Sequence, residues 1–339
     1  MKLGSLVGVL CVACGGGMHA ADPPLSATDV GRPWIKLSLP GPRGPVPAER
    51  VLRTDAGFFA LFNEALGEGK IWTGARTHLY RSRDGVAWDS VSISPVPAGR
   101  GLRDLAYGEG RFVSALPGLQ SSQIWTSTDA RSWSVSEIAV QDANFFRIVH
   151  AGDRFFVLGN SPHLATSSDG TEWKHVALST IQLMGLAFGN GRYVLVGSGP
   201  IQYSDDGLSW NAVKLDCSLP DACITDPSGG VHQHHHEDVV FADGFYVDQL
   251  FSEDGEHWQA HSYPSPEIAV GGYLLGRSNP RSRWGVPPYE GEREDIDAWK
   301  PGGTIATIRV DAIQTSALAG RNCLNHRCVV IKNVIYLIP

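Results

Sequence analysis

Residues 80–88 read YRSRDGVAW, and the pattern of these nine residues recurs along the chain. The shared core is Ser, any residue, Asp, usually Gly, two further residues and Trp. The four other copies are WTSTDARSW at 125–133, ATSSDGTEW at 165–173, QYSDDGLSW at 202–210 and LFSEDGEHW at 250–258. A motif that returns roughly every 40 residues is typical of a repeat architecture.

Each residue of the motif has a physical role in a tight turn between two strands. The Asp accepts hydrogen bonds from backbone amides, the Gly supplies a positive φ, and the Trp fills space between neighbouring sheets. At position 130 an Ala replaces the Gly, which predicts a strained turn or one of another type. We assign a structural and not a catalytic role to the five Asp and Trp pairs: Asp84 and Trp88, Asp129 and Trp133, Asp169 and Trp173, Asp206 and Trp210, Asp254 and Trp258.

The stretches that precede the motifs repeat as well. They include LRDLAYGEGRFVSAL at 102–116, FRIVHAGDRFFVLG at 146–159 and MGLAFGNGRYVLVG at 184–197. Each predicts a strand, a Gly-containing turn and a second strand, and the motif then adds a third strand, a turn and a fourth. A four-stranded antiparallel unit of about 40 residues is the signature of a propeller blade.

A series of Trp residues at intervals of 37 to 54 residues indicates the number of blades: Trp34, Trp88, Trp133, Trp173, Trp210, Trp258 and Trp299. Trp34 opens a strand that has no three strands before it, whereas residues 316–339 supply about three strands and no fourth. We therefore predict an all-β chain forming a single β-propeller of seven four-stranded blades, with the ring closed by the N-terminal strand. Six blades is the alternative, because residues 264–310 match the repeat poorly.

The motif resembles the Asp-box, or BNR repeat, of sialidase-like β-propellers. The usual pattern there, Ser-x-Asp-x-Gly-x-Thr-Trp, is one residue longer than the five copies, and only residues 29–34, DVGRPW, show the longer spacing. The resemblance covers most of the chain and implies a propeller. It implies no single activity, since such propellers include glycosidases, lectins, receptors and assembly factors. FRIV at 146–149 is similar to the Phe-Arg-Ile-Pro element of sialidases, but we interpret Arg147 as an inward-facing residue of a strand.

The N-terminus has the layout of an export signal. Lys2 precedes an apolar run at 3–14 and three glycines, which predicts a signal peptide over 1–21 and a propeller domain over 22–339. Cys14 is a lipidation candidate in a lipobox-like stretch, and ordinary cleavage near Gly17 or Ala21 is the other reading. We expect an exported protein that is periplasmic, an outer-membrane lipoprotein or secreted.

Composition excludes several partners. A net charge of −7 argues against nucleic acid, because phosphate binding needs clustered Lys and Arg. No apolar run has the roughly 18 residues that a transmembrane span requires, so a lipid anchor is the membrane attachment left open. We expect a monomer. No P-loop, dinucleotide fingerprint, GxSxG or HExxH motif is present in the sequence, which disfavours nucleotide chemistry and the common hydrolases.

The cysteines outside the signal come in two close pairs. Proximity predicts the bridges Cys217–Cys223 and Cys323–Cys328, which suits an exported chain. A zinc site is the alternative, but the C-x5-C and C-x4-C spacings fit the common zinc patterns poorly.

One departure from the repeat, the loop 216–238, ends in a His cluster. Four His residues within five positions are followed by Glu237 and Asp238. Imidazoles beside a carboxylate suit Zn, Cu, Ni, Fe or Mn. In an extended segment alternate residues share a face, so we predict a metal set of His232, His234, His236 and Glu237. A solvated polar loop is the alternative interpretation.

The second departure is the loop 277–298, which mixes Arg, aromatic and acidic residues. The leading hypothesis is a non-catalytic module that binds a protein or a glycan through the loops 216–238 and 277–298. The second is a polysaccharide lyase or glycosidase, with catalytic candidates His234, His236, Tyr289 and Glu290. The third is a protein that binds a transition metal without catalysis.

Overall fold

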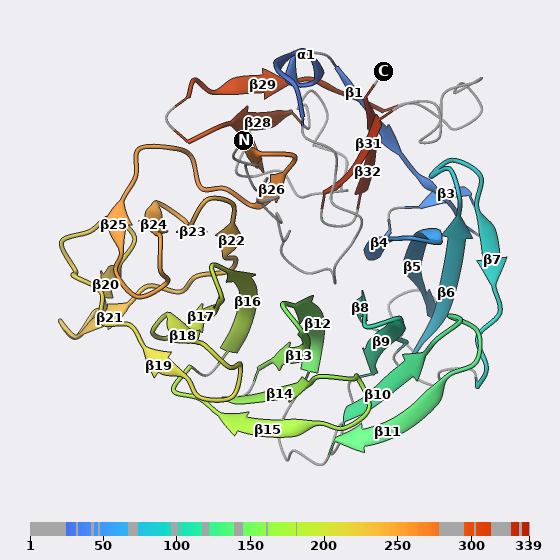
Figure 1. The fold of residues 1–339 in the computed structure, drawn as a ribbon, viewed down its shortest axis with the longest axis horizontal. Helices are drawn as coiled ribbons and strands as arrows, with labels where there is room; N and C mark the ends of the chain where they lie inside the picture. The colour runs from blue at the N-terminus through green and yellow to red at the C-terminus, as the bar shows by residue number, and fades with distance from the viewer. Residues whose placement is uncertain are drawn as a thin grey trace, which may run out of the picture.

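The protein is almost entirely β-structure, arranged as sheets around a common centre (Figure 1). A computed structural model describes residues 25–31, 33–41, 44–46, 48–66, 74–95, 101–102, 104–116, 122–138, 145–160, 162–180, 182–277, 295–301, 303–312, 327–331 and 334–338. Within these residues the strands form seven four-stranded sheets and two small two-stranded ones. This is a seven-bladed β-propeller, as the sequence predicts.

Six of the sheets are simple up-and-down meanders of four consecutive strands. From the innermost strand outwards they are β4 (Arg50–Thr54), β5 (Gly57–Leu66), β6 (Gly74–Ser82) and β7 (Asp89–Val91); β8 (Asp104–Gly108), β9 (Arg111–Leu116), β10 (Ser122–Ser127) and β11 (Ser134–Ile138); β12 (Phe145–Ala151), β13 (Arg154–Gly159), β14 (His163–Ser167) and β15 (Lys174–Ala177); β16 (Gln182–Gly189), β17 (Arg192–Ser198), β18 (Gln202–Ser204) and β19 (Asn211–Ala212); β22 (Val240–Phe241), β23 (Phe245–Val247), β24 (Leu250–Ser252) and β25 (Gln259–Ala260); β26 (Ile268–Val270), β27 (Tyr273–Arg277), β28 (Ile296–Trp299) and β29 (Ala306–Ile308). The poorly matching stretch 264–310 therefore supplies a complete sheet, which excludes the six-bladed alternative.

The seventh sheet combines both ends of the described chain. Its order from the centre outwards is β31 (Arg327–Ile331), β32 (Val334–Ile338), β1 (Trp34–Leu37) and β30 (Val310–Ala312). The N-terminal strand β1 pairs with β32 antiparallel, so it joins the last sheet as expected. It takes the third position and not the fourth, because β30 pairs with it in parallel on the outside. The innermost strand β31 contacts both β26 and β4, the innermost strands of the neighbouring sheets.

The five motif segments form one kind of turn, here called the repeat turns, between the third and fourth strands of their sheets. In each, the Asp carboxylate accepts hydrogen bonds from the Ser hydroxyl and two backbone amides. Four of them place Gly in the left-handed region, and Ala130 adopts the same conformation with φ +62°. The turn at Ala130 is therefore of the same type as the other four, and its Ala has a strained backbone conformation.

The hydrophobic core lies between adjacent sheets. One cluster joins Leu61 and Leu79 of the first sheet to Leu105 and Trp133 of the second, and similar clusters lie at the following boundaries. The repeat turns contribute to these contacts. A Cβ at Gly170 would lie 2.8 Å from Val113 Cγ2, a side chain of the preceding sheet, so Gly is required there for close approach as well as for its φ of +73°.

Two short elements lie outside the meanders. Helix α1 (Ala27–Val30) begins at Ser26, whose hydroxyl accepts a hydrogen bond from the Asp29 amide while the Asp29 carboxylate accepts one from the Ser26 amide. Asp29 of the DVGRPW stretch thus caps a helix. Strands β2 (Leu39–Gly41) and β3 (Gly44–Val46) form a hairpin. In the described part of the chain no helix has the length and apolar character needed to cross a membrane.

Candidate functional site

The loop 216–238, called the arm below, runs between the outermost strand β19 of one sheet and the innermost strand β22 of the next. Its middle forms a hairpin of β20 (Cys223–Thr225) and β21 (Val231–Gln233) at the rim of the propeller (Figure 1). Its end lies nearer the centre, where the Asp238 carboxylate forms an ion pair with Arg147 of β12 at 3.2 Å. The arm therefore connects the rim of the molecule to its inner strands.

Covalent and polar contacts hold the arm in one conformation. The predicted Cys217–Cys223 disulfide is confirmed, with the Cα atoms 5.2 Å apart. Asp226 closes the hairpin by accepting hydrogen bonds from the amides of Ser228 and Gly230. The hydroxyl of Ser228 and the ring of His232 also bond this carboxylate, and together these contacts hold the pKa of Asp226 well below its usual range.

Each strand of the hairpin exposes one aliphatic side chain, Ile224 on β20 and Val231 on β21. Ile224 is 46% exposed and Val231 is 60% exposed. In the described residues only two other large hydrophobic side chains are comparably exposed, Val135 on β11 and Ile305 before β29. The arm thus holds half of the exposed large hydrophobic residues that the structure describes.

The four His residues of the arm are divided among three environments. His232 pairs with β20 through Ile224 and contacts the Asp226 carboxylate at 2.7 Å. His235 lies against β17, where its Nδ1 is 2.6 Å from the Ser198 hydroxyl. Strand β21 ends at Gln233, so the alternation expected of an extended segment stops before the rest of the run. The structure consequently separates His232 from His234 and His236.

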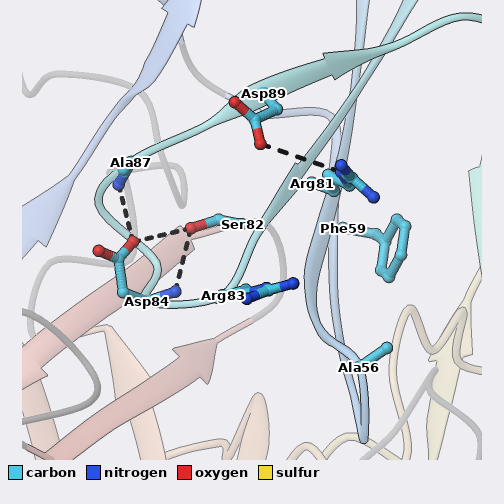
Figure 2. Close-up of a pocket in the computed structure, with 8 residues that line it drawn as sticks. All are labelled: Ala56, Phe59, Arg81, Ser82, Arg83, Asp84, Ala87 and Asp89. Carbon is cyan, nitrogen blue, oxygen red and sulfur yellow. Dashed lines mark hydrogen bonds and ion pairs between the residues drawn. The ribbon is translucent and has the colours of Figure 1, made fainter.

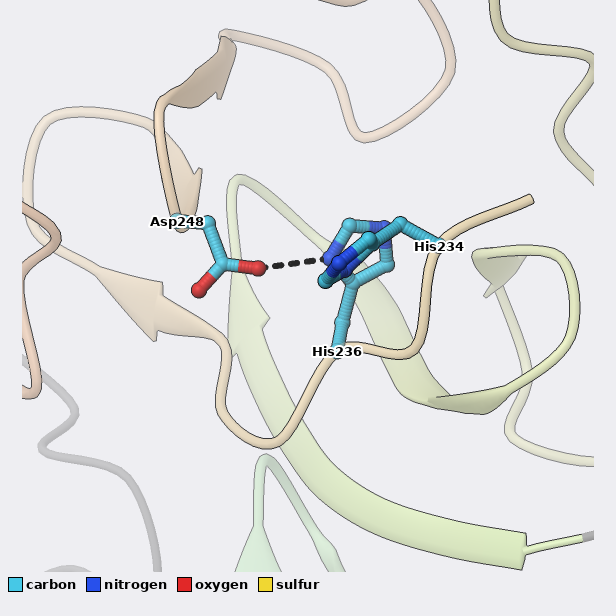
Figure 3. A group of neighbouring side chains, drawn as sticks. All are labelled: His234, His236 and Asp248. Atoms are coloured by element: carbon cyan, nitrogen blue, oxygen red, sulfur yellow. Dashed lines mark hydrogen bonds and ion pairs between the residues drawn. The ribbon is translucent and has the colours of Figure 1, made fainter. Parts of the chain in front are cut away.

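His234 and His236 lie together with Asp248, a residue of the next sheet (Figure 3). The imidazole rings are 5.6 Å apart between centroids, and His236 Nδ1 is 2.7 Å from Asp248 Oδ2. His236 is fully buried, whereas the Asp248 side chain is 32% exposed. Among the described residues His236 Nε2 and His234 Nδ1 have no hydrogen-bond partner although both atoms are buried. Glu237, included in the predicted metal set, is exposed.

Asp248 comes from the tight turn between β23 and β24, with φ +49°. The sequence pattern around Asp248 does not indicate a functional residue, because GFYVDQLF reads as two ordinary strands. A usable signal was present, however. In an up-and-down sheet, the turn between the second and third strands lies on the same face as the connection between blades. A polar residue in that turn is therefore close to the end of the arm.

The Arg147 side chain forms hydrogen bonds with other residues of the propeller. Its Nη1 donates hydrogen bonds to the Met184 carbonyl and to Asp238 Oδ1. The neighbouring Ile148 amide donates to Asp104, which also forms a buried ion pair with Arg50 at 3.1 Å. These bonds link successive innermost strands around the centre, and they agree with the interpretation of Arg147 as an inward-facing strand residue.

The repeat turns differ from the arm in how their polar groups are used. Hydrogen bonds from backbone amides lower the pKa of Asp129 to about 2, the amide of Ser132 contributing most, and the pKa of Asp206 is likewise lowered to about 2. A hollow of about 550 Å³ adjoins the first repeat turn, lined by Ala56, Phe59, Arg81, Ser82, Arg83, Asp84, Ala87 and Asp89 (Figure 2). Its Asp84 carboxylate is occupied by the Val86 and Ala87 amides, so the hollow offers no free catalytic carboxylate at that position.

Several predicted residues lie outside the described residues. These are the signal peptide with Cys14, the catalytic candidates Tyr289 and Glu290, and Cys323 of the second predicted disulfide. Cys328 is on β31, and the pairing of these two cysteines stays a prediction.

Comparison with known proteins adds similarity of shape. No family model and no curated protein sequence matches the chain. Among solved structures it is similar to YCF48 bound to D1 peptide, at 12% identity over 94% of this chain and 97% of that chain, with a TM-score of 0.44. It is also similar to the Nidogen/Laminin complex (11%, 74% and 93%, TM-score 0.40) and to a glycoside hydrolase (11%, 79% and 64%, TM-score 0.38). At such identities we draw no function from these similarities.

Proposed function

We propose that the chain is a binding module that recognises a protein partner through the arm. The observation that carries the proposal is the hairpin β20–β21, which the Cys217–Cys223 disulfide constrains and which holds Ile224 and Val231 exposed at the rim. The partner contacts this hairpin while the propeller serves as a rigid support. Loops on a rigid scaffold are common binding elements because they vary without disturbing the core.

Pre-organisation supports the binding of a macromolecule by the arm. The disulfide, the Asp226 turn and the bond from the His234 amide to the Ala222 carbonyl at 2.9 Å all fix the hairpin before any partner arrives. Ordering a loop on association costs free energy, and an arm that is already ordered avoids most of that cost. Exposed branched aliphatic side chains then supply apolar area that is buried on binding.

The side chains of the arm favour a protein over a glycan. Residues 216–238 contain no Phe, Tyr or Trp, and aromatic rings are the usual large apolar surfaces with a polar edge in recognition sites. The aromatic residues that suggested glycan binding belong to the loop 277–298, most of which lies outside the described residues. The described part of the molecule therefore supports a protein partner best.

The proposal is tested by co-purification from the envelope fraction of cells that produce the protein naturally. The wild-type chain is compared with Ile224→Ser/Val231→Ser and with Val135→Ser, a matched control that removes an exposed aliphatic residue from β11. We expect one partner at constant stoichiometry with the wild type and the control, and its loss with the arm variant. Equal recovery of the partner by the arm variant would refute the proposal.

Other parts of the functional hypothesis stay predictions. A disulfide is compatible with export, and we propose an exported protein that is periplasmic, lipid-anchored or secreted. We also propose that the repeat turns are a shortened variant of the Asp-box. Lyase or glycosidase chemistry stays a prediction, because Tyr289 and Glu290 lie outside the described residues.

A further inference from the structure

The cluster of His234, His236 and Asp248 is chemically distinct from the rest of the arm. Every carboxylate of the repeat turns is bonded within its own turn, and His232 and His235 each have a partner. His236 Nε2 and His234 Nδ1 are buried with no partner among the described residues. A buried nitrogen without a hydrogen bond is destabilising, and here two such nitrogens lie in a group of two imidazoles and one carboxylate whose ligand atoms are close enough together to hold an ion.

We propose that His234, His236 and Asp248 form a binding site for a single zinc ion. Imidazole nitrogens combined with one carboxylate suit zinc and its first-row neighbours, whereas calcium and magnesium prefer sites made only of oxygen ligands. The three side chains leave a fourth position for water or a partner's side chain.

The geometry is close to what a zinc ion requires. One nitrogen of each imidazole and one oxygen of Asp248 all lie within 4.8 Å of one another, and His236 Nδ1 is 2.7 Å from Asp248 Oδ2. Neighbouring ligands of a tetrahedral zinc ion with bonds of about 2.1 Å are separated by about 3.4 Å. The 4.8 Å limit exceeds this value, so the three side chains would move closer together around a bound ion. The partly exposed Asp248 leaves a route for the ion to enter from solvent.

The three residues of the site come from two separate parts of the chain. His234 and His236 belong to the arm, whereas Asp248 belongs to the turn between β23 and β24 of the following sheet. A zinc ion would therefore crosslink the inner end of the arm to the next blade. Metal binding does not depend on the partner proposed above, because the cluster is complete within this chain.

The test uses the full-length chain without an affinity tag, stripped with a chelator and titrated with zinc chloride by calorimetry. We expect one zinc ion per chain. The variants His234→Ala, His236→Ala and Asp248→Asn should each weaken zinc affinity at least tenfold, in line with the effect of altering even supporting groups of metal sites. His232→Ala and His235→Ala are matched controls from the same run and should change the affinity less than twofold.

Two further measurements make the result decisive. Thermal melts in chelator identify any variant that fails to fold. If the His variants fail to fold, the zinc affinity of the near-isosteric Asp248→Asn variant tests the site instead. Cobalt substitution reports geometry, and the visible absorption of a tetrahedral centre should appear in the wild type and be lost in His234→Ala. The proposal is overturned if the wild type binds no zinc stoichiometrically. It is equally overturned if His232→Ala weakens binding as much as His236→Ala does, since the run would then act as an unstructured His tag.

Discussion

The repeat turns and the arm use similar polar residues in opposite ways. In each repeat turn the Asp carboxylate is bonded to one hydroxyl and two amides of the same turn, and the arrangement recurs five times. The arm contains one such turn at Asp226, but its inner end holds His234 and His236 with unpartnered buried nitrogens. The carboxylates of the repeat turns are fully bonded and stabilise the fold, whereas the unpartnered nitrogens of His234 and His236 lie together in a cluster that also contains the Asp248 carboxylate.

The same difference separates the consequences of substitution. The repeat turns contact the core between blades, so changes there should affect the whole propeller. The arm adds a hairpin at the rim and few buried residues, so changes there should leave the propeller intact and alter binding.

Replacing Trp133 with Ala should destabilise the whole protein. Trp133 is 5% exposed, belongs to the core between the first two complete sheets and donates its ring N–H to the Ala130 carbonyl. Removing such a side chain typically lowers the free energy of unfolding by about 3–5 kcal/mol. Urea unfolding followed by far-UV circular dichroism measures the loss. Ile224→Ser in the arm should change the value by less than about 0.5 kcal/mol, and a comparable loss there would break the distinction.

Acid should destabilise the propeller through His150, which is 1% exposed and packs against Gly108. Burial lowers the pKa of His150 to about 4. The unfolded chain therefore binds this proton near pH 6.5 and the folded chain only near pH 4. The free energy of unfolding therefore has its full value above pH 6.5. It decreases by about 3 kcal/mol as the pH falls to 4, because the unfolded chain is then favoured by protonation of His150.

The control for this effect comes from another blade. Phe241 contacts Gly189 as His150 contacts Gly108, since an added Cβ would lie 2.1 Å and 2.2 Å from the respective rings. We expect His150→Phe to fold and to show a smaller loss between pH 7 and pH 4 than the wild type. Urea unfolding at both pH values measures this, and identical pH dependence of the two proteins would exclude His150 as the source.

Removing the disulfide by Cys217→Ala/Cys223→Ala should act on the arm alone. The bridge closes a loop with a sequence separation of 6, and the chain-entropy relation gives about 2 kcal/mol for a loop of this size. Hydrogen exchange of the amides in β20 and β21 should accelerate accordingly, while exchange in β12 to β14 should not change. Faster exchange in both regions would contradict this prediction, because it would show that the arm and the propeller unfold as one unit.

The smallest effect is expected for Asp206→Asn in a repeat turn. The carboxylate accepts bonds from the Leu208 and Ser209 amides at 2.8 and 2.7 Å, and the neutral amide oxygen of Asn is a weaker acceptor. The free energy of unfolding should fall by about 1 kcal/mol, measured by urea titration at pH 7. Zinc binding should be unchanged, so a loss of zinc affinity in this variant would contradict the structural role assigned to the turns.

Local pattern was enough to predict the repeated part of the molecule. The motif at 80–88 and its copies specify a turn through residues that bond to their own backbone, and strands follow from the alternation around them. The Cys217–Cys223 bridge was also predictable, because a short loop brings the two cysteines together in almost any conformation. The blade count followed from the Trp series, including a sheet at 264–310 whose sequence matches the repeat poorly.

The candidate site was predictable only in part. The His run pointed to the arm, but extended periodicity placed His232 with His234 and His236, and the end of β21 at Gln233 separates them. Asp248 was not predicted, since its relation to the arm depends on which turn shares a face with it. The outer position of β30 beside β1 was likewise missed, because parallel pairing leaves no short-range signal in the sequence.

The amino-acid sequence alone is enough to infer the repeat, the turn chemistry and the place where the pattern breaks, and it favours seven blades over six. These properties arise from residues near one another in the chain, so spacing and residue type are sufficient to infer them. The folded arrangement of the blades is needed to see which imidazoles lie beside Asp248, which contact Asp226 or Ser198, and which nitrogens have no partner among the described residues. Those relations depend on contacts between successive blades, where distance in space is independent of distance in sequence.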